Sequence, residues 1–370
     1  RKNMKRINAV HSVIMSNEDS IFNYFGWPSV TILSDGTLVC VASGFRLGHV
    51  CPFGKSCISY SRDNGRTWTK PAPVIDTPLD DRDSGITCIG GNRVIITSFN
   101  NTAMAQRGYA GEDKETDSKF VKKRRAFIYA YLDLLDETKL QEKYYGSTYV
   151  ISEDGGYTFG EVKRAPISNI HGPSVSPSGE VIYIGRAFER EPDRVECWKM
   201  KEDDSFEFVS AIENVSDEHG SLLSCEPCSV ILPDGKILVH IRVQRGGKGV
   251  KKVFTTYQCQ STDGGKTFTK PYDLKNEGAP CHLLRHSSGV LIGTYGYRNP
   301  PFGQRVMLSR DDGNTWDMDY ILRDDGETGD LGYPCTTELP DGRLLSVYYQ
   351  AEPGNSHTVI MQSIWELPKE

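Results

Sequence analysis

A short pattern, Ser-x-Asp-x-Gly-x-Thr followed by Trp or Phe, occurs four times in this 370-residue chain. The copies occupy residues 61–68, 152–159, 261–268 and 309–316. Each has the chemistry of a hairpin turn, because the aspartate can accept hydrogen bonds from nearby backbone amides and the glycine tolerates positive φ, while the aromatic ring can pack against a sheet. The pattern therefore predicts a repeat architecture built from β-hairpins.

A second repeat lies between these turns and consists of an apolar segment, a tight turn with glycine and another apolar segment. Its turn glycines are Gly36, Gly91, Gly179, Gly235, Gly289 and Gly342. They are separated by 55, 88, 56, 54 and 53 residues, which gives six units with one insertion in the second. Each unit supplies two strands here and two more around the aspartate turn. The sequence thus predicts an all-β fold, a six-bladed β-propeller with four antiparallel strands per blade.

The predicted organisation is a single propeller domain over residues 1–370, with an insertion at about residues 102–147 in the second blade. Hydrophobic periodicity does not decide between helix and strand in the second part of this insertion. Its basic run, Lys-Lys-Arg-Arg at 122–125, is interpreted as a solvated face rather than a binding patch. The segment 358–365 is expected to pair with residues near 9–15 and so close the ring.

Composition and charge narrow the class of protein. The net charge of −6 argues against a general nucleic-acid binder, and no apolar run is long enough to span a membrane. The ten cysteines show no disulfide framework, which favours a cytoplasmic protein unless a signal peptide has been removed for secretion or export to the periplasm. Cys225 and Cys228 lack a second pair, and the eight histidines lack ligand spacing, so no metal or cofactor is expected. Oligomeric state is left open.

Propeller geometry predicts which residues share one mouth of the central channel. Residues that begin the first strand of a blade meet those that follow the second strand. The beginnings are Trp27, Asp83, His171, Glu226, residues 279–282 and Tyr333. The ends include Arg46, Arg186, Arg242 and Arg298. Several guanidinium groups at one mouth suit a carboxylate and favour an acidic sugar as ligand, although some could instead bridge neighbouring blades. The aspartate turns fall on the opposite rim and are expected to be structural.

Tyr333 and Glu226 form a second candidate pair. A phenol is almost un-ionised at neutral pH and needs an adjacent base before it can attack another atom. Glu226 opens the fourth unit and Tyr333 the sixth, so the two side chains are expected to face each other across a narrow channel. A neutral nucleophile also avoids repulsion from a carboxylate on the substrate.

These features resemble the sialidase (neuraminidase) superfamily, with its Asp-box repeats, across nearly the whole chain. The segments that carry the resemblance run from Glu226 to Arg242, from residue 303 through Arg305 to residue 309, and from Tyr333 to residue 335. The resemblance implies that Tyr333 is the nucleophile and Glu226 its base. It also implies that Arg242 and Arg305 bind the substrate carboxylate.

Two departures from that family stand in this chain. The family's Phe-Arg-Ile-Pro motif is replaced by Phe-Gly-Trp-Pro at residues 25–28, so its arginine is missing and Arg46 is the candidate replacement. The loop at residues 43–55 lacks the family's acid/base aspartate. His49 is the leading substitute because its pKa suits proton transfer near neutrality, and Asp81 and Asp83 are the alternatives.

The prediction from the sequence is an exo-acting, sialidase-like glycoside hydrolase on a terminal anionic sugar, either sialic acid or a uronic acid. The candidate catalytic residues are Tyr333, Glu226, His49 and Asp83. The candidate substrate-binding residues are Arg46, Arg242, Arg305, Arg186, Arg298, Trp27 and His171. A polysaccharide lyase acting on a uronate, and a carbohydrate-binding propeller without catalysis, are the alternatives.

Overall fold

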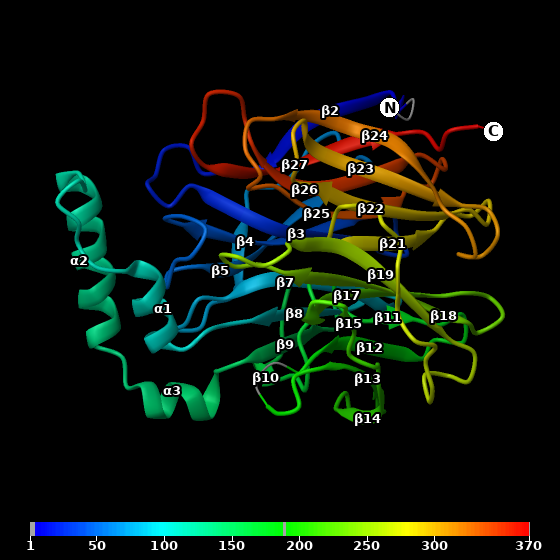
Figure 1. The fold of residues 1–370 in the computed structure, drawn as a ribbon, viewed down its shortest axis with the longest axis horizontal. Helices are drawn as coiled ribbons and strands as arrows, with labels where there is room; N and C mark the ends of the chain where they lie inside the picture. The colour runs from blue at the N-terminus through cyan, green and yellow to red at the C-terminus, as the bar shows by residue number, and fades with distance from the viewer. Residues whose placement is uncertain (1–3, 188–189, 370) are drawn as a thin grey trace.

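The computed structural model describes residues 4–187 and 190–369, and these form a six-bladed β-propeller (Figure 1). The first three blades each contain four antiparallel strands. Blade one contains β3 (Tyr24–Ile32), β4 (Leu38–Arg46), β5 (Lys55–Ser61) and β6 (Ala72–Ile75). Blade two contains β7 (Arg82–Gly90), β8 (Arg93–Phe99), β9 (Ser147–Ser152) and β10 (Lys163–Arg164). Blade three contains β11 (Ser174–Val175), β12 (Val181–Arg186), β13 (Val195–Met200) and β14 (Phe206–Ala211).

The remaining blades follow the same order from the channel outward. Blade four contains β17 (Leu223–Ile231), β18 (Ile237–Arg245), β19 (Val253–Ser261) and β20 (Tyr272–Asp273), and a small ribbon of β15 (Ser216–Asp217) and β16 (Gly220–Ser221) precedes it. Blade five contains β21 (Cys281–Arg285), β22 (Leu291–Tyr297), β23 (Phe302–Ser309) and β24 (Asp317–Gly326). Blade six contains β25 (Gly332–Glu338), β26 (Leu344–Ala351), β27 (Thr358–Trp365) and β2 (Ala9–Met15). The predicted fold is confirmed.

The two ends of the chain close the ring within blade six. Strand β2 pairs antiparallel with β27, with Ala9 opposite Trp365 and Ser12 opposite Gln362. The expected pairing is therefore confirmed. It also explains why the sixth unit lacks the repeated turn, since its outer strand comes from the N-terminus. The short β1 (Lys5–Arg6) adds to β24 in parallel and joins blade five to the closure.

The four repeated turns share one hydrogen-bond pattern. In each, the serine Oγ accepts from the glycine amide at 2.8–2.9 Å, and the aspartate accepts from the threonine amide at 2.9 Å and from the threonine hydroxyl at 2.6 Å. The threonine bonds hold the pKa of Asp63 down at about 2. The turn glycines also join blades, because the carbonyls of Gly65 and Gly313 accept from Gln362 and Gln258 of the preceding blades.

The hydrophobic core lies between neighbouring sheets. Val39 and Val41 of blade one pack with Ile86 and Ile96 of blade two, and the same arrangement recurs around the ring. Because the strands are buried on both faces by adjacent blades, they read as continuous apolar runs in the sequence.

The insertion in blade two is helical. It contains α1 (Ala103–Ala110), α2 (Lys119–Asp133) and α3 (Glu137–Lys143), which form an arm beside the propeller (Figure 1). The side chains of Thr102, Ser118 and Asp136 cap the three helices by accepting from amides of their first turns. No helix among the described residues is long and apolar enough to cross a membrane.

We expect Gly313→Ala to destabilise the protein more than Gly36→Ala. Both glycines have φ of +85°, so alanine at either position costs about 1–2 kcal/mol in backbone strain. A Cβ at Gly313 would also lie 2.7 Å from Leu238 of the preceding blade, whereas a Cβ at Gly36 meets no atom within 4 Å. Overpacking adds about 1–3 kcal/mol, which urea unfolding would measure. Equal losses would show that the turn does not hold the blades together.

Candidate active site

Four inner strands carry the same backbone irregularity at the mouth. Trp27, Asp83, Glu226 and Tyr333 have φ between +47° and +53°, a region that costs a non-glycine residue about 1–3 kcal/mol. Each lies where the pairing of the inner strand with its neighbour shifts register, in β3, β7, β17 and β25. Such bulges re-aim side chains beside functional sites. Here they bring side chains from four blades together.

Tyr333 and Glu226 meet across the channel as the sequence predicts. The Tyr333 hydroxyl donates to Glu226 Oε1 at 2.6 Å. Arg242 Nη1 donates to Glu226 Oε2 at 2.7 Å and to the Tyr333 hydroxyl at 2.9 Å. Burial and the nearby Glu226 charge raise the pKa of Tyr333 well above its usual value, against the effect of Arg242. The phenol is therefore neutral, hydrogen-bonded to a carboxylate and held beside a cation.

A second arginine covers the tyrosine ring. The Arg298 guanidinium lies 5.6 Å from the centroid of Tyr333, and it donates to the Leu331 carbonyl at 3.1 Å and to the Tyr349 hydroxyl at 3.3 Å. Its Nη1 donates to no group within the described residues. Arg242, within β18, and Arg298, just after β22, thus supply positive potential on the Tyr333 side of the mouth.

Arg46 does not reach the mouth as a free cation. Arg46 and Asp80 are both fully buried and form an ion pair at 2.6 Å. Arg82 shares Asp80 at 3.3 Å, and its guanidinium lies 4.2 Å from the Trp27 ring centroid. Asp80 therefore neutralises one of the two arginines. Burial acts to lower the pKa of Arg82, but the nearby charges of Asp80 and Asp83 raise it overall, so Arg82 keeps its charge beside Trp27.

Arg82 is a residue of the mouth that the sequence alone does not point to. It sits next to Asp83 in the Asp-Asp-Arg-Asp run at 80–83, which is the available signal. In a regular strand the neighbouring side chains of Arg82 and Asp83 would point to opposite faces. The bulge at Asp83 breaks this alternation, so the sequence pattern alone does not place both side chains near the mouth. Within the described chain, Nε and Nη2 of Arg82 have no hydrogen-bond partner, whereas Nη1 donates to the His49 carbonyl at 2.9 Å.

Asp83 is a buried carboxyl group that faces a cavity. It is 4% exposed, and its Oδ1 has no hydrogen-bond partner among the described residues. The cavity has a volume of about 210 Å³ and is lined by Asp83, Glu226 and Arg242 together with Asn101, Asn169, Arg186 and Gln244. Burial raises the pKa of Asp83 to about 7, with Arg82 opposing the shift and Glu226 adding to it. Asp83 can therefore hold or release a proton near neutral pH.

His49 is held at the edge of the site by a carboxylate. Its Nδ1 lies 2.9 Å from Asp330 Oδ1 and 3.0 Å from the Tyr24 hydroxyl, and its side chain is half exposed. Its ring packs edge-on against Trp27 at 5.0 Å. Asp330 also accepts from Tyr24 and Tyr349, so its hydrogen bonds tie the loop of blade one to blade six.

The remaining predicted residues lie at different depths. Arg186 lines the cavity, where Asp193 holds it through two bonds of 2.8 and 2.5 Å. Arg305 lies on β23 with its guanidinium 4.6 Å from the Tyr297 ring, and no contact found in the described structure links it to Tyr333. His171 is buried deeper in the channel, 2.8 Å from Ser29 Oγ, and burial lowers its pKa well below the usual value.

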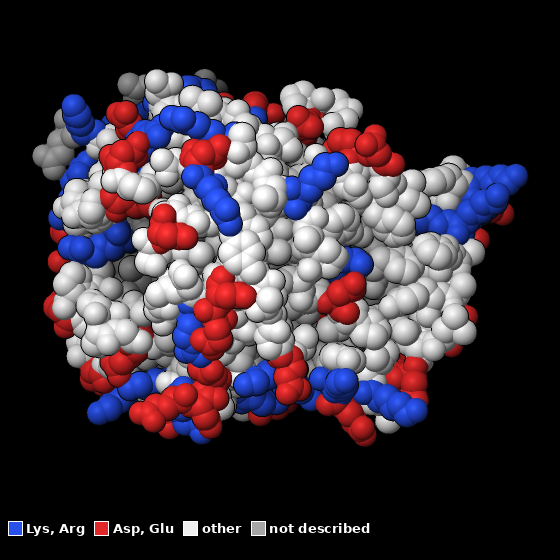
Figure 2. All heavy atoms as spheres, turned by 180° about the vertical axis from the view of Figure 1, so that it is seen from behind, with Lys and Arg blue, Asp and Glu red and all other residues white. Residues whose placement is uncertain are grey.

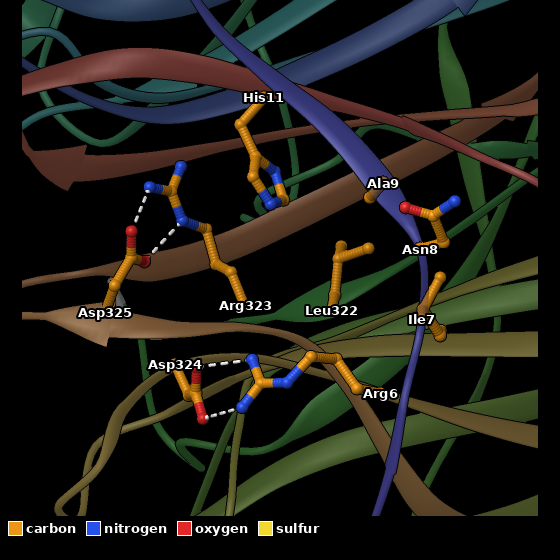
Figure 3. Close-up of a pocket in the computed structure, with 9 residues that line it drawn as sticks. All are labelled: Arg6, Ile7, Asn8, Ala9, His11, Leu322, Arg323, Asp324 and Asp325. Carbon is orange, nitrogen blue, oxygen red and sulfur yellow. Dashed lines mark hydrogen bonds and ion pairs between the residues drawn. The ribbon is translucent and has the colours of Figure 1, made fainter.

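Outside the mouth, a metal-binding cluster, a disulfide or another hollow could also mark a functional site. The described residues contain no group of three or more His, Cys, Asp or Glu side chains arranged to hold a metal ion. All ten cysteines are free thiols. A hollow of about 410 Å³ lies near the N-terminal strand, where Arg6 pairs with Asp324 and Arg323 pairs with Asp325 (Figure 3). The charged side chains that line this hollow are paired with one another, whereas the mouth holds charged groups that have free hydrogen-bonding positions in the described structure.

The molecule is a six-bladed β-propeller with a sialidase-like fold. A protein of unknown function from Dyadobacter fermentans DSM 18053 superimposes with a TM-score of 0.71 and 21% identity over 98% of this chain and 99% of that one. The intramolecular trans-sialidase from Ruminococcus gnavus gives a TM-score of 0.62 and 14% identity over 94% and 96%. The alpha-L-arabinofuranosidase from Fusarium graminearum gives 0.59 and 12% identity over 98% of each chain. No family model and no curated protein sequence matches this chain.

We expect the Asp83→Asn variant to be more stable than the wild type at pH 8, with the advantage shrinking toward pH 5. With a folded pKa of about 7 and an unfolded pKa near 3.9, the folded wild type keeps a proton that the unfolded chain loses. Its free energy of unfolding therefore falls by about 1.4 kcal/mol per pH unit as pH rises between those values. Asparagine lacks this dependence, and thermal melts across pH would measure the difference.

The exposed Asp312→Asn variant is the matched control, and its melting temperature should follow that of the wild type across the same pH range. If Asp83→Asn also follows the wild type at every pH, Asp83 is ionised in the folded protein at neutral pH and cannot serve as a proton donor there.

Proposed function

We propose that this protein is a retaining glycoside hydrolase that removes a terminal sugar, with Tyr333 as nucleophile. The observation that carries the proposal is the 2.6 Å hydrogen bond from the Tyr333 hydroxyl to Glu226, with Arg242 bound to both groups. Most glycosidases use two carboxylates, and a tyrosine nucleophile beside a carboxylate base is the sialidase exception. The sialidase and arabinofuranosidase structures with this fold support a glycosidase rather than an unrelated activity.

The proposed reaction proceeds in two steps. In the first, Glu226 takes the phenolic proton as Tyr333 Oη attacks the anomeric carbon, and Asp83 gives its proton to the leaving oxygen as the glycosidic bond breaks. In the second, Asp83 takes a proton from water, whose oxygen attacks the same carbon. The bond to Tyr333 breaks in the same displacement, and the proton on Glu226 returns to the phenolate oxygen. Two inversions leave the anomeric configuration unchanged.

Asp83 fits the acid/base role better than His49. Asp83 lines the same cavity as Glu226, and its buried Oδ1 is unpaired among the described residues. A pKa of about 7 allows the group to donate a proton in one step and accept one in the next at neutral pH. The Nδ1 atom of His49 is instead hydrogen-bonded to Asp330 and Tyr24.

An anionic terminal sugar is the substrate class that the charges favour. Arg242 and Arg298 contact Tyr333, and Arg82 lies over Trp27, which packs against Tyr333. Arg298 and Arg82 retain N–H donors without partners in the described structure. A guanidinium keeps its charge at any working pH and can bind a carboxylate through paired hydrogen bonds. Sialic acid and uronic acids share that carboxylate, so both belong in the substrate panel.

Replacing Tyr333 by Phe tests the nucleophile. We expect hydrolysis to fall by about 10²-fold or more, because the attacking oxygen is lost while the ring is kept. The panel comprises 4-methylumbelliferyl glycosides of sialic acid, glucuronic acid and L-arabinofuranose, with proton NMR of the first product to read the anomeric configuration. An inverted product, or a Tyr333→Phe variant as active as the wild type, contradicts the proposed mechanism. An unsaturated uronide would identify a lyase.

A pair of variants separates the two acid candidates. Asp83→Asn should lose activity on a natural glycoside, yet keep much of the first step on a 4-methylumbelliferyl glycoside, whose leaving group needs little protonation. The wild-type rate on a natural glycoside should fall as pH rises above about 7, as Asp83 loses its proton, and this alkaline limb should disappear in the variant. His49→Asn should preserve the limb. The reverse assignment follows if His49→Asn abolishes it and Asp83→Asn does not.

A further inference from the structure

The helical arm presents an apolar stripe that the propeller leaves largely exposed. Phe120, Phe127 and Leu134 follow one another at intervals of seven residues along and just beyond α2, so they lie on one side of it. They are 60%, 50% and 87% exposed. The opposite side of α2 is occupied, since Ile128 and Leu132 pack against the propeller loop that carries Leu47 and Cys51. The stripe is thus a surface and not part of the core.

An aromatic groove continues this stripe onto the propeller. The Phe127 ring stacks on Phe53 at 4.9 Å, and Phe53 meets Phe22 edge-on at 5.9 Å. Phe22 and Phe53 line a groove of about 440 Å³ together with Phe45 and Pro73. Uncharged side chains cover much of the surface between the arm and the propeller body (Figure 2). Lys55, paired with Asp76, also lines this half-buried groove. The exposed stripe and the groove adjoin one another, and large exposed apolar surfaces mark interaction sites.

Charges of opposite sign flank this surface on different elements. Lys119, Lys122 and Lys123 lie in the first turns of α2, and they form no ion pair among the described residues. Basic side chains gather at the far end of the projecting arm (Figure 2). On the groove side, the loop bounded by the lining residues Asn17 and Ser20 carries Glu18 and Asp19, both exposed. Glu18 contacts His357 at 3.1 Å, and Asp19 has no ionic partner in the described structure.

We propose that the arm and the aromatic groove form a two-fold interface with a second copy of this chain. In such an interface the same patch is used twice, so it must be complementary to itself. This patch meets that condition, because a basic apolar arm on one copy can enter the groove of the other beside its acidic loop, and the reverse contact forms at the same time. A lipid surface suits the patch less well, since the acidic loop borders the groove and anionic headgroups would repel it.

Sedimentation velocity over a range of protein concentrations tests the interface. The wild type should show a monomer–dimer equilibrium that weakens as salt is added, because the flanking ion pairs are solvent-exposed. Phe120→Glu should raise the dissociation constant about tenfold or more, since it places an unpaired charge in the apolar contact. Val250→Glu, at another exposed apolar residue outside the arm, is the control and should leave the equilibrium unchanged.

Charge reversal supplies an independent test of the partner. The triple variant of Lys119, Lys122 and Lys123 to Glu should weaken the dimer, and adding Glu18→Lys and Asp19→Lys in the same chain should restore it. Circular dichroism melts confirm that each variant remains folded. A wild type that stays monomeric at every concentration, or a dimer unaffected by Phe120→Glu and by the charge variants, overturns the proposal. Monomers that bind phosphatidylcholine–phosphatidylserine vesicles through Phe120 overturn it in favour of a membrane surface.

Discussion

The pairing of β2 with β27 is the constraint on which the site depends. Each blade is a separate sheet, and the groups at the mouth come from all six blades, with Arg186 from blade three. Only a closed ring fixes their distances, because the six sheets share no strand with one another in the described structure. The repeated turns add to this closure by binding the carbonyls of Gly65 and Gly313 to glutamines of the preceding blades. A hydrogen bond of 2.6 Å between Tyr333 and Glu226 is therefore a property of the whole ring.

Within that ring, backbone strain at the mouth is offset by packing between blades, and most buried charges there are offset by a neighbouring charge of opposite sign. Four inner-strand residues adopt positive φ, which is unfavourable for each, and the packing of the blades holds them there. Several buried charges form ion pairs. Asp80 pairs with both Arg46 and Arg82, and Glu226 pairs with Arg242. Asp83 departs from this pattern. It adds a carboxyl group near Glu226 with no hydrogen bond to its Oδ1 among the described residues, so the proton that it keeps is the least costly way to bury it.

The sequence predicts the fold well because its signals are local and repeated. Turn glycines and aspartate turns recur with nearly constant spacing, and blade order alone places Glu226 and Tyr333 at the same mouth. What depends on contacts between blades is harder to foresee. Arg46 is the last residue of β4, one position before its expected place, and only the tertiary structure reveals that Asp80 binds it. Arg82 is recognised only once the bulge at Asp83 is known, and the helical state of the insertion depends on packing of α2 against residues 47–53.

If the proposed mechanism holds, the arrangement also bears on why a tyrosine would serve where most glycosidases use a carboxylate. The mouth already holds the carboxyl groups of Glu226 and Asp83, and a third carboxyl group there would crowd like charges together and repel an anionic sugar. A buried phenol avoids that cost, because desolvation keeps it neutral until a base removes its proton. Arg242 contacts the phenol and the base together, so it can stabilise negative charge on whichever oxygen carries it. The same cation therefore stabilises negative charge both before and after proton transfer, which lowers the cost of deprotonating Tyr333 inside a buried site.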